Sequence, residues 1–250
     1  MKEFMRSLII GAAAMLLLTA SAGAGMVGEE GSLLDTGNPD EVATVLEIVV
    51  VLTILTLAPA ILMLTTSFTR IIVVLSFLRR ALATQQLPPN QVLIGLAVLL
   101  TAVVMTPTWA KMYDAGFGPF IEREISVREA LVRAEKPMRE FMLRQTRVTD
   151  IELMVSLSKT KVSEQLLPKE IPTHVLVSAF VISELTRAFT MGFILYLPFV
   201  IIDLVIATTL ISMGMLVLPP ILISLPFKIL LFVLVDGWAL MVKSMVAGFY

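Results

Sequence analysis

The chain has 250 residues, of which 57% are hydrophobic and only 16% are charged, and its formal net charge at pH 7 is −1. Average soluble domains are about 45–50% apolar and about 25% charged, so this composition indicates a membrane protein and excludes an ordinary soluble enzyme. A net charge this close to zero gives no electrostatic basis for binding nucleic acid. The absence of cysteine excludes disulfides, cysteine-bound zinc, iron–sulfur clusters and thiol nucleophiles.

Residues 1–24 have the features of a secretory signal peptide. Two basic residues precede an unbroken apolar run over residues 8–18, which is short for a membrane span but typical of a signal peptide. Ala22 and Ala24 each end a small-x-small pattern of the kind that signal peptidase cleaves. Cleavage would place the mature amino terminus outside the cytoplasm, whereas an uncleaved anchor is the alternative.

We predict that the signal peptide is removed next to Ala22 or Ala24, because these small residues directly follow the apolar run. The glycine-rich and acidic segment 25–41 is then expected to be a flexible leader outside the cytoplasm. Amino-terminal sequencing of the membrane-extracted protein tests this. A mature protein that still begins at Met1 would make the first segment an anchor instead.

Residues 42–109 are expected to form an apolar helical hairpin. A helix needs about 20 apolar residues to cross about 30 Å of hydrocarbon, and suitable segments lie near residues 45–64 and 92–105 with their flanks. Pro88 and Pro89 mark the turn before the second segment, because proline cannot continue a helix. Basic residues favour the cytoplasmic side, so a short loop with three arginines is expected there. These arginines are Arg70, Arg79 and Arg80.

Residues 110–172 form a polar insert that holds 21 of the 39 charged residues, with both signs nearly balanced. We expect a charged helical domain on the periplasmic side, with Pro137 kinking or splitting its first helix. The pattern fits either a docking face or a solvated helical cap over its own core. Two capping boxes precede apolar helical patterns in it: Ser126 with Glu129, and Thr149 with Glu152.

Residues 173–250 are expected to form a second apolar helical hairpin. Pro219 and Pro220 divide this region into two arms, each longer than one bilayer crossing. Pro198 and Pro226 are expected to introduce further bends within the arms.

Charged residues are rare in this apolar hairpin, so each needs a reason. Glu184 and Arg187 are three residues apart and could pair on one helical face. Asp203, Lys228 and Asp236 have no basic or acidic partner within one helical turn. Such groups are expected to pair with another helix or subunit, or to face a water-filled path. A proton or ion relay is the alternative, although a relay usually needs a chain of titratable groups.

Met213, Gly214 and Met215 directly precede the proline pair of this hairpin. Methionine is flexible and fills irregular gaps, and glycine together with proline allows an irregular backbone. The segment fits either ordinary packing or a deformable seal at a constriction.

Six short motifs over roughly residues 65–240 are specific enough to suggest a protein family, and they occur in the order in which that family has them. Together they resemble the FliP family of flagellar export-gate membrane proteins. The motifs are TSFTRI (66–71), PPNQVL (88–93), REFMLRQT (139–146), SEL (183–185), PFVIIDLV (198–205) and PFK through VDGW (226–238).

The resemblance implies an all-α protein of membrane-associated, kinked helical hairpins with a helical extracytoplasmic insert, which assembles into a helical hetero-oligomeric channel. It implies a core subunit of the flagellar type III export apparatus, which passes unfolded flagellar proteins across the bacterial inner membrane at the basal body. FliQ, FliR, further copies of the chain, FlhB and FlhA are the implied partners. In such an assembly, helices interpreted as spans can instead be buried among subunits, because hydropathy does not distinguish lipid from an apolar protein surface.

The resemblance also implies roles for particular residues. A gate loop, residues 213–217, is implied to close the pore. Relatives often have further methionines where this chain has Leu216 and Val217, so a hydrophobic seal is kept with fewer sulfur atoms. The gate residues are Met213, Gly214, Met215, Leu216 and Val217, and the implied subunit-pairing residues are Arg144, Glu184, Asp203, Lys228 and Asp236.

Two other functions share some of these features. An injectisome homologue would use the same mechanism, but the cleavable signal peptide argues against it. An ion-coupled secondary transporter would show paired interrupted segments in two repeats, and the sequence has no convincing repeat. No catalytic motif or phosphate loop occurs, and a lone histidine, His174, makes a poor metal site. We therefore expect no enzyme activity, no cofactor and no metal.

Overall fold

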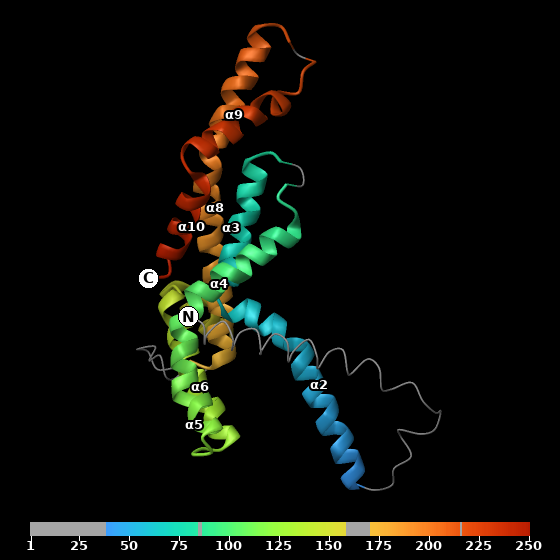
Figure 1. Ribbon diagram of the computed structural model, residues 1–250, viewed down its shortest axis with the longest axis vertical. Coiled ribbons are helices and arrows are strands. Elements are labelled where there is room, and N and C mark those ends of the chain that lie inside the picture. Colours follow the sequence, from blue (N-terminus) through green and yellow to red (C-terminus); the bar gives the residue numbers. More distant parts are fainter. Residues whose placement is uncertain (1–38, 85–86, 159–170, 216) are drawn as a thin grey trace, which may run out of the picture. The chain divides into compact units, whose positions relative to one another are not determined.

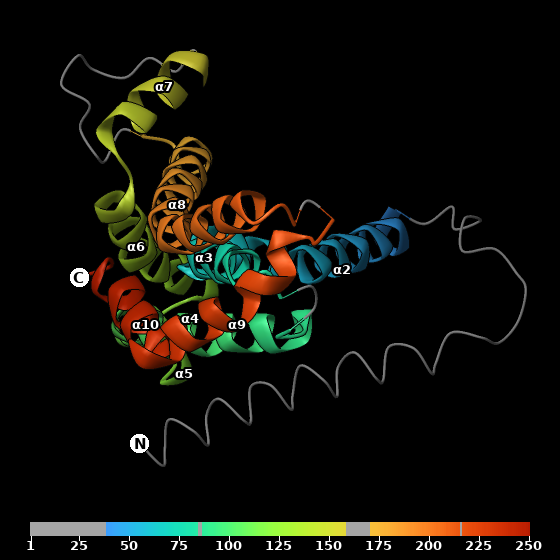
Figure 2. The same cartoon turned by 90° about the horizontal axis from the view of Figure 1, so that it is seen from above.

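The protein is described by a computed structural model that covers residues 39–84, 87–158, 171–215 and 217–250. The signal peptide predicted for residues 1–24, and nearly all of the leader predicted for residues 25–41, lie outside the described residues. Residues 57–250 form one compact unit. Every element within the described ranges is a helix, which confirms the all-α prediction (Figures 1 and 2).

In chain order the helices are α2 (Pro39–Thr65), α3 (Phe68–Ala81), α4 (Asn90–Met112), the π-helix η1 (Tyr113–Phe117), α5 (Gly118–Ile121), α6 (Val127–Gln145), α7 (Val148–Ser158), α8 (Thr173–Ser212), α9 (Pro220–Leu234) and α10 (Gly237–Ala247).

The predicted cytoplasmic loop with three arginines is a helix, α3. One face of α3 is apolar at helical spacing, and it is buried through Ile71, Val74, Leu75 and Leu78. Arg70 lies on this same face and is fully buried. The prediction of a basic loop was therefore wrong, and Arg70 cannot contribute to membrane orientation as an exposed charge.

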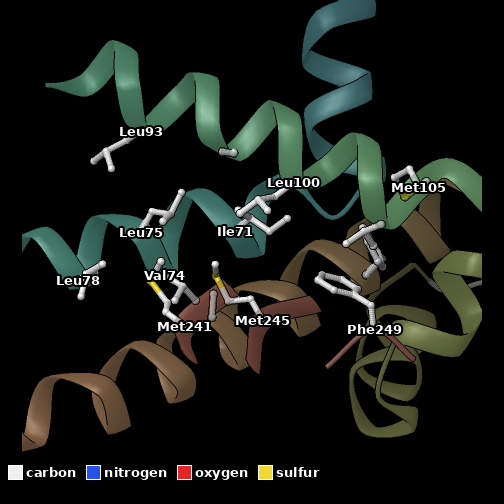
Figure 3. Close-up of a cluster of buried hydrophobic side chains, with 14 of the residues drawn as sticks. Ile71, Val74, Leu75, Leu78, Leu93, Leu100, Met105, Met241, Met245 and Phe249 are labelled. Atoms are coloured by element: carbon white, nitrogen blue, oxygen red, sulfur yellow. The ribbon is translucent and has the colours of Figure 1, made fainter. Parts of the chain in front are cut away.

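The core of the unit is built around α3, which packs against α4 and α8. Figure 3 shows α3 side chains between Leu93 and Leu100 of α4 on one side and Met241 and Met245 of α10 on the other. α3 and α8 approach closely at Gly192, where an added Cβ would lie 2.6 Å from the ring of Phe77. A glycine is needed at this contact because any side chain would overlap the ring.

The polar insert folds as helices that pack on the apolar ones. α6 begins as predicted, since the backbone N–H of Glu129 donates to Ser126 Oγ over 3.3 Å. Pro137 does not split α6, which continues for 19 residues. Proline removes one backbone hydrogen bond, and the packing of α6 on α4, η1 and α8 compensates for this loss.

The second predicted capping box, Thr149 with Glu152, is wrong. α7 begins at Val148, and the carbonyl of Arg147 accepts from the N–H groups of Asp150 and Ile151. Thr149 therefore lies inside the first turn instead of preceding it. α7 packs against α8 (Figure 2). The periplasmic location of residues 110–172 stays a prediction.

Three helical stretches among the described residues are long and apolar enough to cross a membrane: Ile48–Thr65, Asn90–Ile121 and Thr173–Ser212. The bent pair of α9 and α10 would raise this number to four if it forms one span. Many of the large apolar side chains on α8, and most of those on α9, are exposed in the isolated chain. They require lipid or the surfaces of partner subunits as a cover.

Candidate functional site

The second apolar hairpin holds most of the predicted functional residues, which lie on α8, on α9 or in the segments directly after these two helices. Pro198 and Pro226 lie inside these helices and end neither of them. The second arm instead breaks at Asp236, which adopts a left-handed backbone with φ 49°, and α9 and α10 differ in direction by 64°. Aspartate tolerates this conformation better than most residues. Gly237 follows it, and an added Cβ there would lie 2.3 Å from the ring of Phe232.

The gate loop begins with a well-defined helix end. Gly214 has φ 76°, and its N–H donates to the carbonyl of Ile211 over 3.0 Å. The N–H of Met215 donates to the carbonyl of Leu210 over 3.0 Å. These two bonds form a Schellman motif, which satisfies the last carbonyls of α8 and needs a residue with positive φ. The irregular backbone expected at this glycine therefore has a specific form, the end of α8.

The gate loop presents apolar side chains to the outside of the chain. Met213, Met215 and Val217 are all exposed, Val217 to 96%, while Leu216 lies outside the described residues. α9 then begins at Pro220 directly after Pro219, where proline is favoured because the first helical N–H needs no partner. The loop therefore lies between two fixed helix ends, and the side chains described in it are exposed.

A buried charge pair joins the two helices on either side of the gate loop. Lys228 Nζ of α9 lies 2.7 Å from Asp203 Oδ2 of α8, and Ser224 Oγ donates to Asp203 Oδ1 over 2.6 Å. Lys228 is only 1% exposed. The partner expected on another helix is thus supplied by the same chain, and the pair links α8 to α9.

Replacing Lys228 with alanine is expected to destabilise the hairpin, because Asp203 loses its cation and a cavity replaces a buried side chain. Removing one member of a buried pair costs about 3–5 kcal/mol, and the partial exposure of Asp203 places this variant at or below the low end. The measurement is the amount of chain recovered in the assembled export complex.

The double variant Lys228→Met/Asp203→Leu is the matched control for this pair. It leaves no unpaired charge, so it should restore most of the assembly. If Lys228→Ala assembles normally but abolishes proton-dependent export, the pair acts in a relay and not in assembly.

A second buried cluster centres on Arg70. Its guanidinium forms a bidentate ion pair with Glu184 of α8, with Nε donating to Oε2 over 2.9 Å. Nη2 also donates to Gln145 Oε1 of α6 over 3.1 Å, and Nη1 donates to the carbonyl of Gly248 over 3.0 Å. Arg70 and Glu184 are both fully buried. One arginine therefore joins α3, α6, α8 and the segment after α10.

The pairing considered from sequence for Glu184 was wrong. Glu184 faces Arg70, and Arg187 instead donates from Nη1 to Gln145 Oε1 over 3.0 Å. The three-residue spacing suggested Arg187 as the partner of Glu184. Arg70 can instead bind the Glu184 carboxylate through two hydrogen bonds, which is the stronger interaction.

The neighbouring residue on α8 anchors α7. Ser183 Oγ donates to Asp150 Oδ2 and accepts from the backbone N–H of Arg147 over 3.0 Å. The side chain of Arg147 also pairs with Asp150 over 2.7 Å. The hydrogen bond from Arg147 holds the pKa of Asp150 below its usual value. The contact is therefore strongest above the ordinary aspartate pKa of about 3.9 and weakens as the pH falls through the lower folded value.

Arg144 and Asp236, the other two predicted pairing residues, are exposed. Neither has an ion-pair partner within the described part of the chain. Arg144 lines a small cavity of about 110 Å³ together with Lys111.

Sequence reasoning missed Arg70 and Gln145 as members of the buried cluster. Arg70 lies in the apolar stripe of α3, which continues at Ile71, Val74 and Leu75. A lone arginine at a core position of a helical pattern is the signal that could have indicated a buried charge with a distant partner.

The profile of the FliP family matches residues 51–245. The chain belongs to the FliP family. It is 49% identical over 218 residues to the flagellar biosynthetic protein FliP of Bacillus subtilis, an alignment that covers 87% of this chain and 98% of that protein. It is 52% identical to the FliP protein of Pectobacterium carotovorum over 201 residues, or 80% and 77% of the two chains. For the FliP protein of Aquifex aeolicus the identity is 46% over 220 residues, or 88% of each chain.

The region matched to the FliP family contains both buried charge pairs and the gate loop. The expected resemblance is therefore confirmed over most of the chain.

Proposed function

We propose that this FliP-family chain is a core channel-forming subunit of the flagellar type III protein export apparatus, where it passes unfolded flagellar proteins across the inner membrane. The observation that carries the proposal is the match to the family over residues 51–245, together with relatives that bear the name flagellar biosynthetic protein FliP. The extensive exposed apolar surface of α8 and α9 supports a role inside a larger membrane assembly.

The gate loop is the proposed constriction of the pore. Several copies would bring their Met215, Leu216 and Val217 side chains together around one axis, where a narrow apolar ring excludes ions by dewetting. The exposure of Met215 and Val217 supports this role, since the loop of each copy has apolar side chains free to meet those of its neighbours.

Roles for the charged residues follow from their partners in the chain. The pairs Arg70–Glu184 and Asp203–Lys228 are satisfied internally and would shape each subunit for assembly. Arg144 and Asp236 are exposed and would be available for pairing between subunits.

FliQ, FliR, further copies of this chain, FlhB and FlhA are the proposed partners, with the assembly at the basal body and a large part on the periplasmic side. Purification of the full chain in mild detergent, followed by mass spectrometry of co-purifying proteins, tests this. Two small, strongly apolar proteins in fixed ratio to the chain are expected. Recovery of the chain as a monomer that transports a small solute with a coupling ion would identify a transporter instead.

A further inference from the structure

A small pocket lies where α4, α6 and the segment after α10 meet. Figures 1 and 2 show the end of the chain beside α6, where the ring of Phe249 stacks on Phe141 at 6.4 Å between centroids. These two rings form part of the apolar side of the pocket. Its volume is about 110 Å³, and one water molecule takes about 30 Å³ of the liquid. The pocket therefore admits a group of a few heavy atoms and excludes a larger ligand.

The polar side of the pocket presents hydrogen-bond donors. It is formed by Thr108 and Lys111 of α4, Arg144 of α6 and Tyr250, and we call the whole the basic pocket. Lys111 and Arg144 are both exposed, and no acidic side chain lines the pocket. Lysine and arginine side chains donate hydrogen bonds and accept none. The basic pocket is therefore complementary to an anion.

The chain leaves these polar groups without internal partners. Asp114 and Glu140 are near the two cations in sequence, but neither they nor the carboxyl group of Tyr250 form an ion pair with Lys111 or Arg144 among the described residues.

Thr108 gives a second, independent sign of an absent partner. It is only 4% exposed, yet its hydroxyl group makes no hydrogen bond within the ranges that the structure describes. Buried hydroxyl groups are normally hydrogen-bonded. A ligand in the basic pocket would supply the acceptor that Thr108 lacks.

Aromatic residues favour a position of the pocket at the membrane surface. Tryptophan and tyrosine are enriched at membrane–water interfaces, and the chain has only two tryptophans and three tyrosines. Trp109 and Tyr113 flank Lys111 in the sequence, and Tyr250 lines the pocket. Lys111 is also the one charged residue of α4 and lies in its last turn. This combination is typical of the level at which an apolar helix leaves the hydrocarbon.

An exposed apolar track on α4 leads to the pocket. Leu99, Val103, Pro107 and Lys111 follow one another at intervals of four residues and are all exposed. Residues at this spacing are neighbours on adjacent helical turns. Leu99 and Val103 are 66% and 59% exposed, while Pro107 and Lys111 line the pocket. The track therefore continues from an apolar surface to a cation.

We propose that the basic pocket binds the phosphate group of an anionic phospholipid, with an acyl chain along Leu99 and Val103. Lys111 and Arg144 neutralise the phosphate, and the hydroxyl group of Thr108 gains an acceptor. This lipid site goes beyond protein export and does not depend on it. The competing occupants are a free anion and a carboxylate of a partner subunit. A free anion has no use for the apolar track, and the flanking aromatic residues favour a lipid over a protein carboxylate.

The test uses the full chain in complex with its export partners, purified in a neutral detergent. Phosphatidylglycerol is titrated into the complex, and bound lipid is counted by native mass spectrometry. Phosphatidylcholine with the same acyl chains is the reference, because its headgroup carries no net charge. We expect phosphatidylglycerol to bind about ten-fold more tightly, since basic residues attract anionic headgroups.

Lys111→Gln/Arg144→Gln is expected to raise the Kd of phosphatidylglycerol by about ten-fold or more, because each cation beside an anionic headgroup contributes about five-fold. Arg128→Gln/Lys136→Gln is the matched control. It removes the same charge from exposed positions of α6 that do not line the pocket, so the Kd should not change. Thr108→Val keeps the shape and both charges, is expected to raise the Kd a few-fold, and serves if the first double variant does not accumulate.

Four outcomes would overturn the lipid site. Equal affinity for the two lipids, or equal weakening by the control variant, would show only a general attraction to charge. Displacement of phosphatidylglycerol by inorganic phosphate at equal concentration would assign the pocket to a free anion. Lipid binding to the full chain purified alone, but not to the assembled complex, would show that a partner subunit fills the pocket. Each result leaves the proposed export role intact, because the complex itself is recovered before lipid is added.

Discussion

Replacing Glu184 with alanine is expected to prevent stable accumulation of the chain. Arg70 would remain fully buried without its carboxylate, and breaking a buried ion pair in this way costs about 3–5 kcal/mol. Total folding free energies are only about 5–15 kcal/mol, so this loss removes a large share of the stability. The measurement is the protease resistance and the amount of the chain in membranes.

The matched control for this variant is Glu129→Ala. Glu129 pairs with Arg133 one turn away on α6, and both side chains are well exposed. Exposed pairs of this kind contribute about 0.3–0.5 kcal/mol, so the chain should accumulate normally. The double variant Arg70→Met/Glu184→Leu separates the two costs of the single change, since it removes both charges and should recover part of the stability. Normal levels of the Glu184→Ala chain would contradict the role assigned to the buried pair.

Features of the fold that depend on local sequence were predicted well. The helix start at Ser126 follows from a capping rule that involves residues three positions apart. The turn before α4 follows from Pro88 and Pro89 in the same way. Segment lengths likewise identified the long apolar helices.

Features that depend on distant residues were not predictable from one sequence. Arg70 and Glu184 are 114 positions apart, so no pattern within a helix could join them. The rule that proline interrupts a helix also failed at two positions. Pro137 and Pro198 remain inside helices that packing holds in place. At Asp236, by contrast, a helix ends without a proline in the turn. The break there comes from the left-handed backbone of the aspartate itself.

The charged residues likewise show which features local sequence can predict and which depend on distant residues. Sequence reasoning identified Asp203 and Lys228 as groups that need partners, because ionised groups are costly in apolar surroundings. It could not say that they pair with each other, since the loop between α8 and α9 decides which residues of the two helices face one another. The Schellman end at Gly214 and the helix start at Pro220 fix this alignment, and the pair at 2.7 Å is its consequence.

Deleting residues 215–217 is expected to make the assembled export complex leak small ions. The deletion removes the apolar side chains that would close the pore and shortens the connection between Gly214 and Pro219, so the copies could no longer meet on the axis. The measurement is ion conductance across membranes that contain the complex with its partners. Ser212→Ala is the control, because it changes one exposed hydroxyl in the last turn of α8 and leaves the loop intact.

A second variant of the gate loop tests which property seals the pore. Leu216→Met/Val217→Met keeps the segment apolar and makes it more flexible, so the complex should remain impermeable to ions. A seal that depends on the shape of branched side chains would instead leak in this variant. If the deletion of residues 215–217 leaves the complex as tight as the parent, the constriction lies elsewhere in the assembly. The exposed loop would then be a contact surface for a partner subunit, because Met213, Met215 and Val217 present apolar side chains to the outside.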